Sequence, residues 1–134
     1  MEKVISVKDK TLGALSGRDA IFLDSFSQDE FGNLTFCGEI NSTLSENSQG
    51  KKFVPYTLKF SGVIAYYACE LDTYYDKYAV GEESSFDVVE KSKWLAALPS
   101  RDGEDKASRK HYRLYTYDFV YNIIAKDYEM NLNM

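Results

Sequence analysis

The sequence predicts a single α+β domain, residues 1–134, built on a strongly bent, mainly antiparallel sheet of five to seven strands with two covering helices. In the extreme case the bend makes the sheet barrel-like. Three observations lead to this prediction. A chain of 134 residues fits one domain with one core. Eleven Tyr and eight Phe against two Pro form an ordered, β-prone composition. Most segments alternate apolar and polar residues, whereas two have helical spacing.

The first forty residues predict a short edge strand and a hairpin. Val4–Val7 is a brief apolar run that could form the edge strand. Ala20–Phe26 is a compact apolar segment, typical of a buried strand. Gly32 and Asn33 tolerate the backbone of a turn, and Leu34–Ile40 then alternates apolar and polar side chains. We expect these two longer segments to pair.

Phe53–Tyr75 is the longest apolar and β-prone stretch, and we expect the other segments to pair with it or cover it. Its apolar row changes phase after Gly62. One extra residue at Ser61–Gly62, as in a β-bulge, would return both apolar rows to one face, and a tight turn is the alternative. A straight strand over Tyr56–Leu71 would be about 50 Å long, far beyond the usual length. The sequence therefore predicts strong curvature or a break at Gly62.

The first predicted helix is Ser84–Leu98. Its apolar side chains, among them Trp94, recur at helical spacing, and Ser84 precedes Asp87 as in a capping box. Residues 86–88 alternate instead, so a helix that begins as late as Ser92 stays open.

The C-terminal third predicts a strand, the second helix and a closing strand. His111–Tyr117 alternates, Asp118 is a suitable N-cap for a helix over Phe119–Lys126, and Tyr128–Leu132 alternates again. The helical segment is apolar nearly all round, which predicts a well-buried helix. We expect Trp94 and a Phe119/Ile123 face to make the contacts between helices and sheet.

Charge and composition restrict the class of partner and the compartment. A net charge of −5 repels phosphate backbones and anionic membranes, which argues against nucleic acid or membrane as a direct partner. No apolar run approaches the roughly 18 residues of a membrane span. Cys37 and Cys69 both lie in predicted strands, where thiols behave as small buried apolar groups. We therefore expect a reducing cytoplasm.

The residues that carry chemistry are few. One histidine, His111, excludes a zinc site with several His ligands, and no phosphate loop or nucleophile motif is present. Glu70 and Asp72 share a strand face about 6–7 Å apart and could act as an acid/base pair. Solvated acids at a strand end are the simpler interpretation. The sequence predicts no cofactor, no metal and no catalytic residue, and favours a binding protein over an enzyme.

The strongest candidate for a binding surface is the interleaving of acids and tyrosines that begins where the long apolar stretch ends. Exposed Tyr is enriched at interface hot spots, and neighbouring acids steer a basic partner. The alternative is a solvated acidic connection whose tyrosines fold back on the sheet edge. The predicted binding residues are Glu70, Asp72, Tyr74, Tyr75, Tyr78, Glu82 and Glu83.

These observations lead to three hypotheses of function. The first is a small acidic protein without catalysis that binds a basic protein, for instance an immunity-type inhibitor of a cationic toxin enzyme. The second is a curved sheet that holds a small ligand in a pocket lined by Tyr66, Glu70 and Asp72, or a minor enzyme that uses the two acids. The third is a structural subunit that associates with itself, for example as a homodimer, through a free strand edge.

Overall fold

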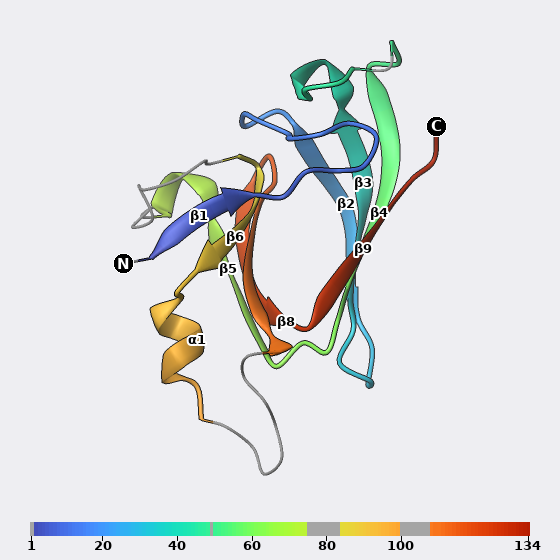
Figure 1. The fold of residues 1–134 in the computed structure, drawn as a ribbon. Helices are drawn as coiled ribbons and strands as arrows, with labels where there is room; N and C mark the ends of the chain where they lie inside the picture. The colour runs from blue at the N-terminus through green and yellow to red at the C-terminus, as the bar shows by residue number, and fades with distance from the viewer. Residues whose placement is uncertain (1, 49, 75–83, 100–107) are drawn as a thin grey trace.

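The computed structural model describes residues 2–48, 50–74, 84–99 and 108–134, which form two antiparallel sheets that face each other (Figure 1). The five-stranded sheet has the order β1-β6-β7-β8-β5, and the four-stranded sheet has the order β2-β3-β4-β9. The strands are β1 (Lys3–Ser6), β2 (Ile21–Gln28), β3 (Leu34–Asn41), β4 (Phe53–Ser61), β5 (Ala65–Glu70), β6 (Phe86–Glu90), β7 (Lys110–Tyr115), β8 (Phe119–Ala125) and β9 (Asp127–Leu132).

The α+β prediction with two covering helices is therefore wrong, and the described residues belong to an all-β fold. Their one α-helix is α1 (Lys93–Ala97), and two 3₁₀ turns are η1 (Ser42–Leu44) and η2 (Leu71–Thr73). The predicted helix over Phe119–Lys126 is β8 instead. Most of β8 is buried on both faces, and such a strand has a continuous apolar run that periodicity does not separate from a buried helix.

The predicted helix over Ser84–Leu98 is also wrong in its first half, which is strand β6. β6 lies between β1 and β7, so ladder pairing with distant segments outweighs the local helical spacing. The alternative of a helix that begins near Ser92 agrees with α1, whose N-cap is Ser92. Trp94 packs on the sheet as expected, with its ring 5.1 Å from the rings of Tyr67 and His111.

The long apolar stretch breaks at Gly62, where φ is +64°. β4 ends just before this glycine and β5 begins at Ala65 in the other sheet (Figure 1). β9 and β8 make the same crossing beside it, because Ser61 pairs with Asp127 and Ala65 pairs with Ile124. The two pairings show one extra residue on the β4–β5 side of the corner. This corner joins the sheets.

The extra residue does not turn the second apolar row inward, so the predicted change of phase is wrong. Tyr66 lies opposite Ile123, a core residue, whereas Ala65 and Tyr67 lie on the outer face of the five-stranded sheet. That outer face is itself covered, and Val4 and Val89 on it are fully or almost fully buried. Both rows of β5 contain apolar residues because the inner face of this sheet packs on the core and the outer face contacts Trp94 through Tyr67.

Side chains from both sheets fill the space between them. Phe60 of β4 contacts Tyr112 of β7 with ring centroids 5.3 Å apart, and Phe36 of β3 contacts Tyr121 of β8 at 5.0 Å. The core cluster is Leu12, Leu15, Ala20, Ile21, Leu34, Phe36, Ile40, Tyr56, Leu58, Phe60, Phe86, Tyr112, Leu114, Ile123 and Ala125. Since this interior is packed with side chains, it offers no support for a ligand held inside a half-barrel.

Candidate functional site

The predicted acidic, tyrosine-bearing segment is only partly described by the structure. Glu70 ends β5 and is exposed, and Asp72 lies in η2 with its carboxylate 3.5 Å from Arg18 Nη1. Tyr74 folds back on the sheet, with its ring edge-on to Tyr115 and its hydroxyl buried without a partner. The remaining predicted residues, Tyr75, Tyr78, Glu82 and Glu83, lie outside the described residues.

A larger candidate surface lies where the edge strands β2 and β5 approach each other. Phe26 of β2 contacts Tyr66 of β5 at 5.9 Å between ring centroids, and the Tyr66 hydroxyl donates to Gln28 Oε1 at 2.7 Å. Aromatic side chains continue along both sides of this contact. We call them the aromatic seam: Phe22, Phe26, Phe53, Tyr66, Tyr117, Phe119 and Tyr121.

The seam has two groups of rings, because Phe22 pairs with exposed Glu39 and Phe26 pairs with the core residue Phe36 on the opposite face of the four-stranded sheet. In one half Phe22 stacks on Tyr117 at 5.3 Å and meets Phe53 at 6.2 Å. In the other half Tyr121 lies 6.3 Å from Phe119 and 6.0 Å from Phe26. The five most accessible members, Phe26, Phe53, Tyr66, Tyr117 and Phe119, each expose 37–42% of their surface. Accessible rings gathered in this way are typical of a contact surface for another molecule.

The charges beside the seam favour a cationic ligand. Glu70 lies opposite Phe119 in the ladder between β5 and β8. Burial raises the pKa of Tyr121, and the nearby Asp118 carboxylate raises it further. Two seam rings already hold cations of the chain itself: Arg18 lies 5.1 Å from the Tyr117 centroid and Lys52 5.3 Å from that of Phe53. These rings therefore accept guanidinium and ammonium groups on their faces.

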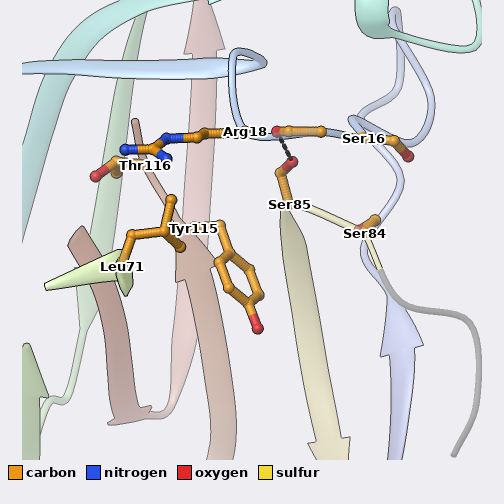
Figure 2. A pocket seen from close by; sticks show the side chains of 8 residues that line it. Ser16, Arg18, Leu71, Ser84, Ser85, Tyr115 and Thr116 are labelled. Atoms are coloured by element: carbon orange, nitrogen blue, oxygen red, sulfur yellow. Dashed lines mark hydrogen bonds between the residues drawn. The ribbon is translucent and has the colours of Figure 1, made fainter. Parts of the chain in front are cut away.

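A pocket of about 370 Å³ adjoins the seam at Arg18 (Figure 2). Leu71 and the Tyr115 ring line it, together with Thr116 and the serines at positions 16, 84 and 85. The Ser85 hydroxyl is engaged, since it donates to Gly17 O at 3.0 Å. An apolar anchor side chain of a partner is the occupant that suits these walls.

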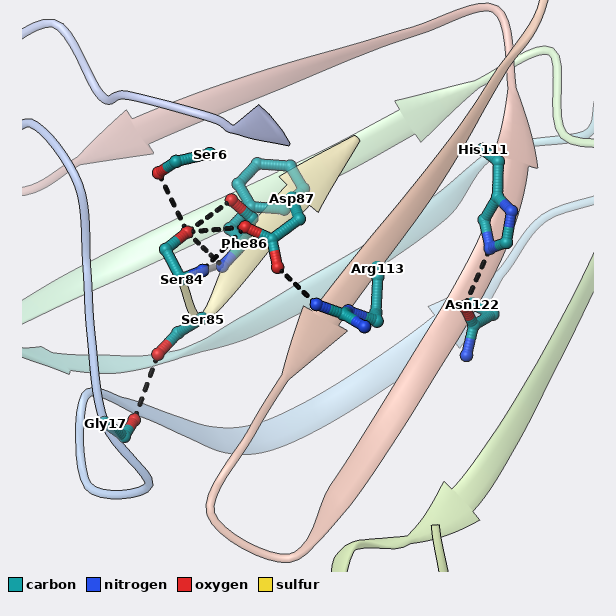
Figure 3. Close-up of polar contacts among 9 residues, drawn as sticks. All are labelled: Ser6, Gly17, Ser84, Ser85, Phe86, Asp87, His111, Arg113 and Asn122. Carbon is teal, nitrogen blue, oxygen red and sulfur yellow. Dashed lines mark hydrogen bonds and ion pairs between the residues drawn. The ribbon is translucent and has the colours of Figure 1, made fainter. Parts of the chain in front are cut away.

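The outer face of the five-stranded sheet carries a buried polar row (Figure 3). Successive ladder partners across the sheet place Asp87 of β6, Arg113 of β7 and Asn122 of β8 side by side, and all three are 0% exposed. Arg113 Nη2 donates to Asp87 Oδ2 at 2.8 Å. Ser84 donates to Asp87 Oδ1 through both its amide and its hydroxyl at 2.8 Å, and Ser6 donates to Ser84 Oγ at 2.9 Å.

Two opposing effects act on the Asp87 carboxyl. Burial disfavours its charged form and raises its pKa above the ordinary value. The Arg113 guanidinium and the Ser84 donors favour the charged form and lower the pKa only in part. Each charge of the Asp87–Arg113 pair compensates the burial of the other, because either charge alone would be buried without a counter-ion.

His111 lies next to this row and bonds through both ring nitrogens. Its Nδ1 is 2.8 Å from Ser92 Oγ, and its Nε2 is 2.7 Å from Asn122 Oδ1. The imidazole is 0% exposed and lies under the Trp94 ring. Sequence reasoning singled out His111 as the one histidine but had no signal for these partners, which come from the β6–α1 junction and from β8.

Sequence reasoning also missed the aromatic seam. Its members are spread from Phe22 to Tyr121, and several occupy strand positions that the apolar pattern assigns to the core. The described residues contain no cluster of His, Cys, Asp or Glu able to hold a metal ion. Nor do they contain a helix with the length and apolarity needed to cross a membrane. Comparisons with models of protein families, with curated proteins and with solved structures found no match.

Proposed function

We propose that this protein binds a basic segment of another protein through the aromatic seam and its flanking acids. The observation that carries the proposal is the row of accessible rings, two of which already hold an Arg or a Lys side chain. A partner's Arg and Lys side chains would stack on further rings while Glu70 and Asp118 neutralise them. The net charge of −5 would speed the approach of such a partner.

An immunity-type inhibitor of a cationic toxin enzyme is the specific form of this function that we favour. Inhibitors of this kind act by covering a basic surface, which requires no catalytic group of their own. The free thiols of Cys37 and Cys69 are compatible with the reducing cytoplasm where such an inhibitor would meet its target.

Selection of phage-displayed random peptides on the immobilised protein tests the proposal. We expect the enriched peptides to be rich in Arg and Lys, and their association to slow as salt rises. The double variant Glu70→Lys/Asp118→Lys should slow association by about tenfold. Glu129→Lys is the matched control, since Glu129 is an exposed acid of β9, at the other edge of the four-stranded sheet from β2. Enrichment of neutral peptides, or equal rates for the double variant, would contradict the proposal.

Self-association is a second candidate because β2 and β5 each pair with a strand on one side only among the described residues. Such edges can accept a strand from a second copy. Sedimentation equilibrium separates the two candidates. A monomer at high protein concentration would exclude self-association, and a dimer that the Phe26→Ser/Tyr66→Ser variant dissociates would support it.

A further inference from the structure

The junction between β6 and α1 places a serine in an unusual setting. Lys91, the residue between the two elements, has a φ of +55°, which is rare for a residue with a side chain. Ser92 follows as the N-cap of α1, where its Oγ accepts from the Leu95 amide at 3.1 Å. A strand, a sharp turn, a serine and a helix in this order hold the serine hydroxyl in a fixed position.

The hydrogen bonds of His111 fix which of its nitrogens carries the proton. Asn122 Oδ1 is an acceptor, so the imidazole Nε2–H donates to it at 2.7 Å. In the neutral ring Nδ1 is then an acceptor, and it faces Ser92 Oγ at 2.8 Å. The Ser92 hydroxyl therefore donates to a base whose orientation the Asn122 side chain sets, as in nucleophile–His–Asn arrangements.

The amide that follows the serine is already occupied by an anion. Lys93 N–H donates to Glu2 Oε2 at 2.9 Å. A backbone N–H directly after a nucleophile is the position from which an oxyanion is stabilised. An oxyanion bound to this amide would have to displace the Glu2 carboxylate.

A pocket of about 740 Å³ opens beside Ser92 and His111. Leu95, Ala96 and Val88 give it apolar walls. Lys91, Arg109 and Lys110 outnumber Glu90 among its charged lining residues and give it net positive charge. Ser92 and His111 both line this pocket, so a ligand in it would lie beside the pair although Ser92 is only 6% exposed.

We propose that Ser92 is an acyl-accepting nucleophile, with His111 as its general base, Asn122 as a positioning residue and anionic carboxylic esters as the substrate class. Ser92 Oγ attacks the ester carbonyl carbon as its proton moves to His111 Nδ1. The bond from that carbon to the alcohol oxygen breaks, and the alcohol leaves with the proton from Nδ1. Water then attacks the acyl-serine, gives a proton to Nδ1, and releases the carboxylic acid as Ser92 Oγ regains that proton.

Labelling with a fluorophosphonate, followed by peptide mass spectrometry, tests the nucleophile. We expect phosphonylation of Ser92 in the folded protein and none in Ser92→Ala. His111→Gln should slow labelling by about 100-fold, the usual contribution of a general base. Ser85→Ala is the matched control: Ser85 is a buried serine, its hydroxyl donates to Gly17 O, and labelling should stay unchanged. Circular dichroism identifies any variant that fails to fold.

Three further measurements test the other assignments. Glu2→Ala should speed labelling, because it removes the acceptor oxygen from the Lys93 amide. Asn122→Asp should move the pH profile of labelling to higher pH, since a carboxylate favours the imidazolium, and a purely structural role of Asn122 would not move that profile. Hydrolysis of the mono-4-nitrophenyl ester of glutaric acid should exceed that of 4-nitrophenyl butyrate. A folded protein unlabelled at Ser92, or labelling that His111→Gln leaves unchanged, would overturn the proposal.

Discussion

At the scale of single residues, the buried ion pair between Asp87 and Arg113 costs desolvation energy. Both side chains are 0% exposed, on the outer face of a sheet where apolar residues would also pack. Ser84 and Ser6 extend the pair into a hydrogen-bonded chain that links β1, the segment before β6, and β7. Our hypothesis is that this chain specifies which strands become neighbours more than it adds to stability.

Removing one partner of this pair should destabilise the protein strongly. Arg113→Met leaves the Asp87 carboxyl buried without its cation, and we expect a loss of about 3–5 kcal/mol in the free energy of unfolding. Asp87→Leu/Arg113→Met should recover most of that loss, because two apolar side chains need no compensation. Urea denaturation of the two variants measures both values. A double variant as unstable as the single one would show that the pair stabilises the fold by itself.

The stability at alkaline pH should depend on Tyr112. Burial, followed by the charges of Asp127 and Tyr128, raises the pKa of Tyr112 to about 12. In the unfolded chain the Tyr112 hydroxyl has an ordinary pKa near 10, so the folded state holds the hydroxyl proton more tightly. Protonated Tyr112 therefore adds to the free energy of unfolding below about pH 10. This added stability, roughly 2–3 kcal/mol, is lost as the pH rises to about 12.

Tyr112→Phe should therefore lose less stability than the wild type between pH 10 and 12. Urea denaturation across this range, with tyrosinate absorbance to follow ionisation, measures the difference. Tyr117→Phe is the control, because Tyr117 is 41% exposed. Parallel pH dependence of the wild type and Tyr112→Phe would contradict this account.

At the scale of elements, β3 depends on a glycine for its place between β2 and β4. Gly38 pairs with Leu23 on one side and Tyr56 on the other. A Cβ at this position would lie 1.9 Å from the Phe22 carbonyl oxygen, which is backbone and has little freedom to move. The irregular register between Leu23 and Ser25 lies at the same place, so β2 bends close to β3 here.

Gly38→Ala should disrupt the pairing of β2 with β3. We expect a loss of about 2 kcal/mol or more in the free energy of unfolding, since the backbone must shift to admit the methyl group. Gly50→Ala is the control, because no atom lies within 4 Å of its Cβ position. Only its φ of +84° disfavours alanine there, so we expect a loss of about 1 kcal/mol in the free energy of unfolding. Hydrogen exchange should show weaker protection in β2 of Gly38→Ala. Equal losses in the two variants would mean that β2 moves aside without cost.

Element types were predictable where one face of a strand meets water. β3 and β4 alternate buried and accessible positions, β9 alternates half-buried and exposed ones, and the sequence pattern locates all three. β8 and β6 were predicted as helices because both of their faces are covered. In such strands the period of two disappears from the sequence, and apolar residues fall at helical spacing by chance.

At the scale of the whole molecule, the candidate binding surface arises from segments that are distant in sequence. The net charge of −5 led to the hypothesis of a basic partner, and Glu70 and Asp72 were located at the end of the long apolar stretch. The aromatic seam was out of reach, because Phe26, Tyr66 and Tyr121 come together only when the edges of two sheets meet. No local pattern separates such accessible rings from core rings.

The sequence by itself determined the β-rich composition, the break at Gly62 and the acidic charge, since each depends on composition or on the conformation of one residue. The tertiary structure decided that β6 and β8 are strands, which row of β5 faces the core, and which partners surround His111 and Asp87. These outcomes depend on what covers the second face of a sheet. The residues that pack on that second face are far away in the chain, so local periodicity does not predict them.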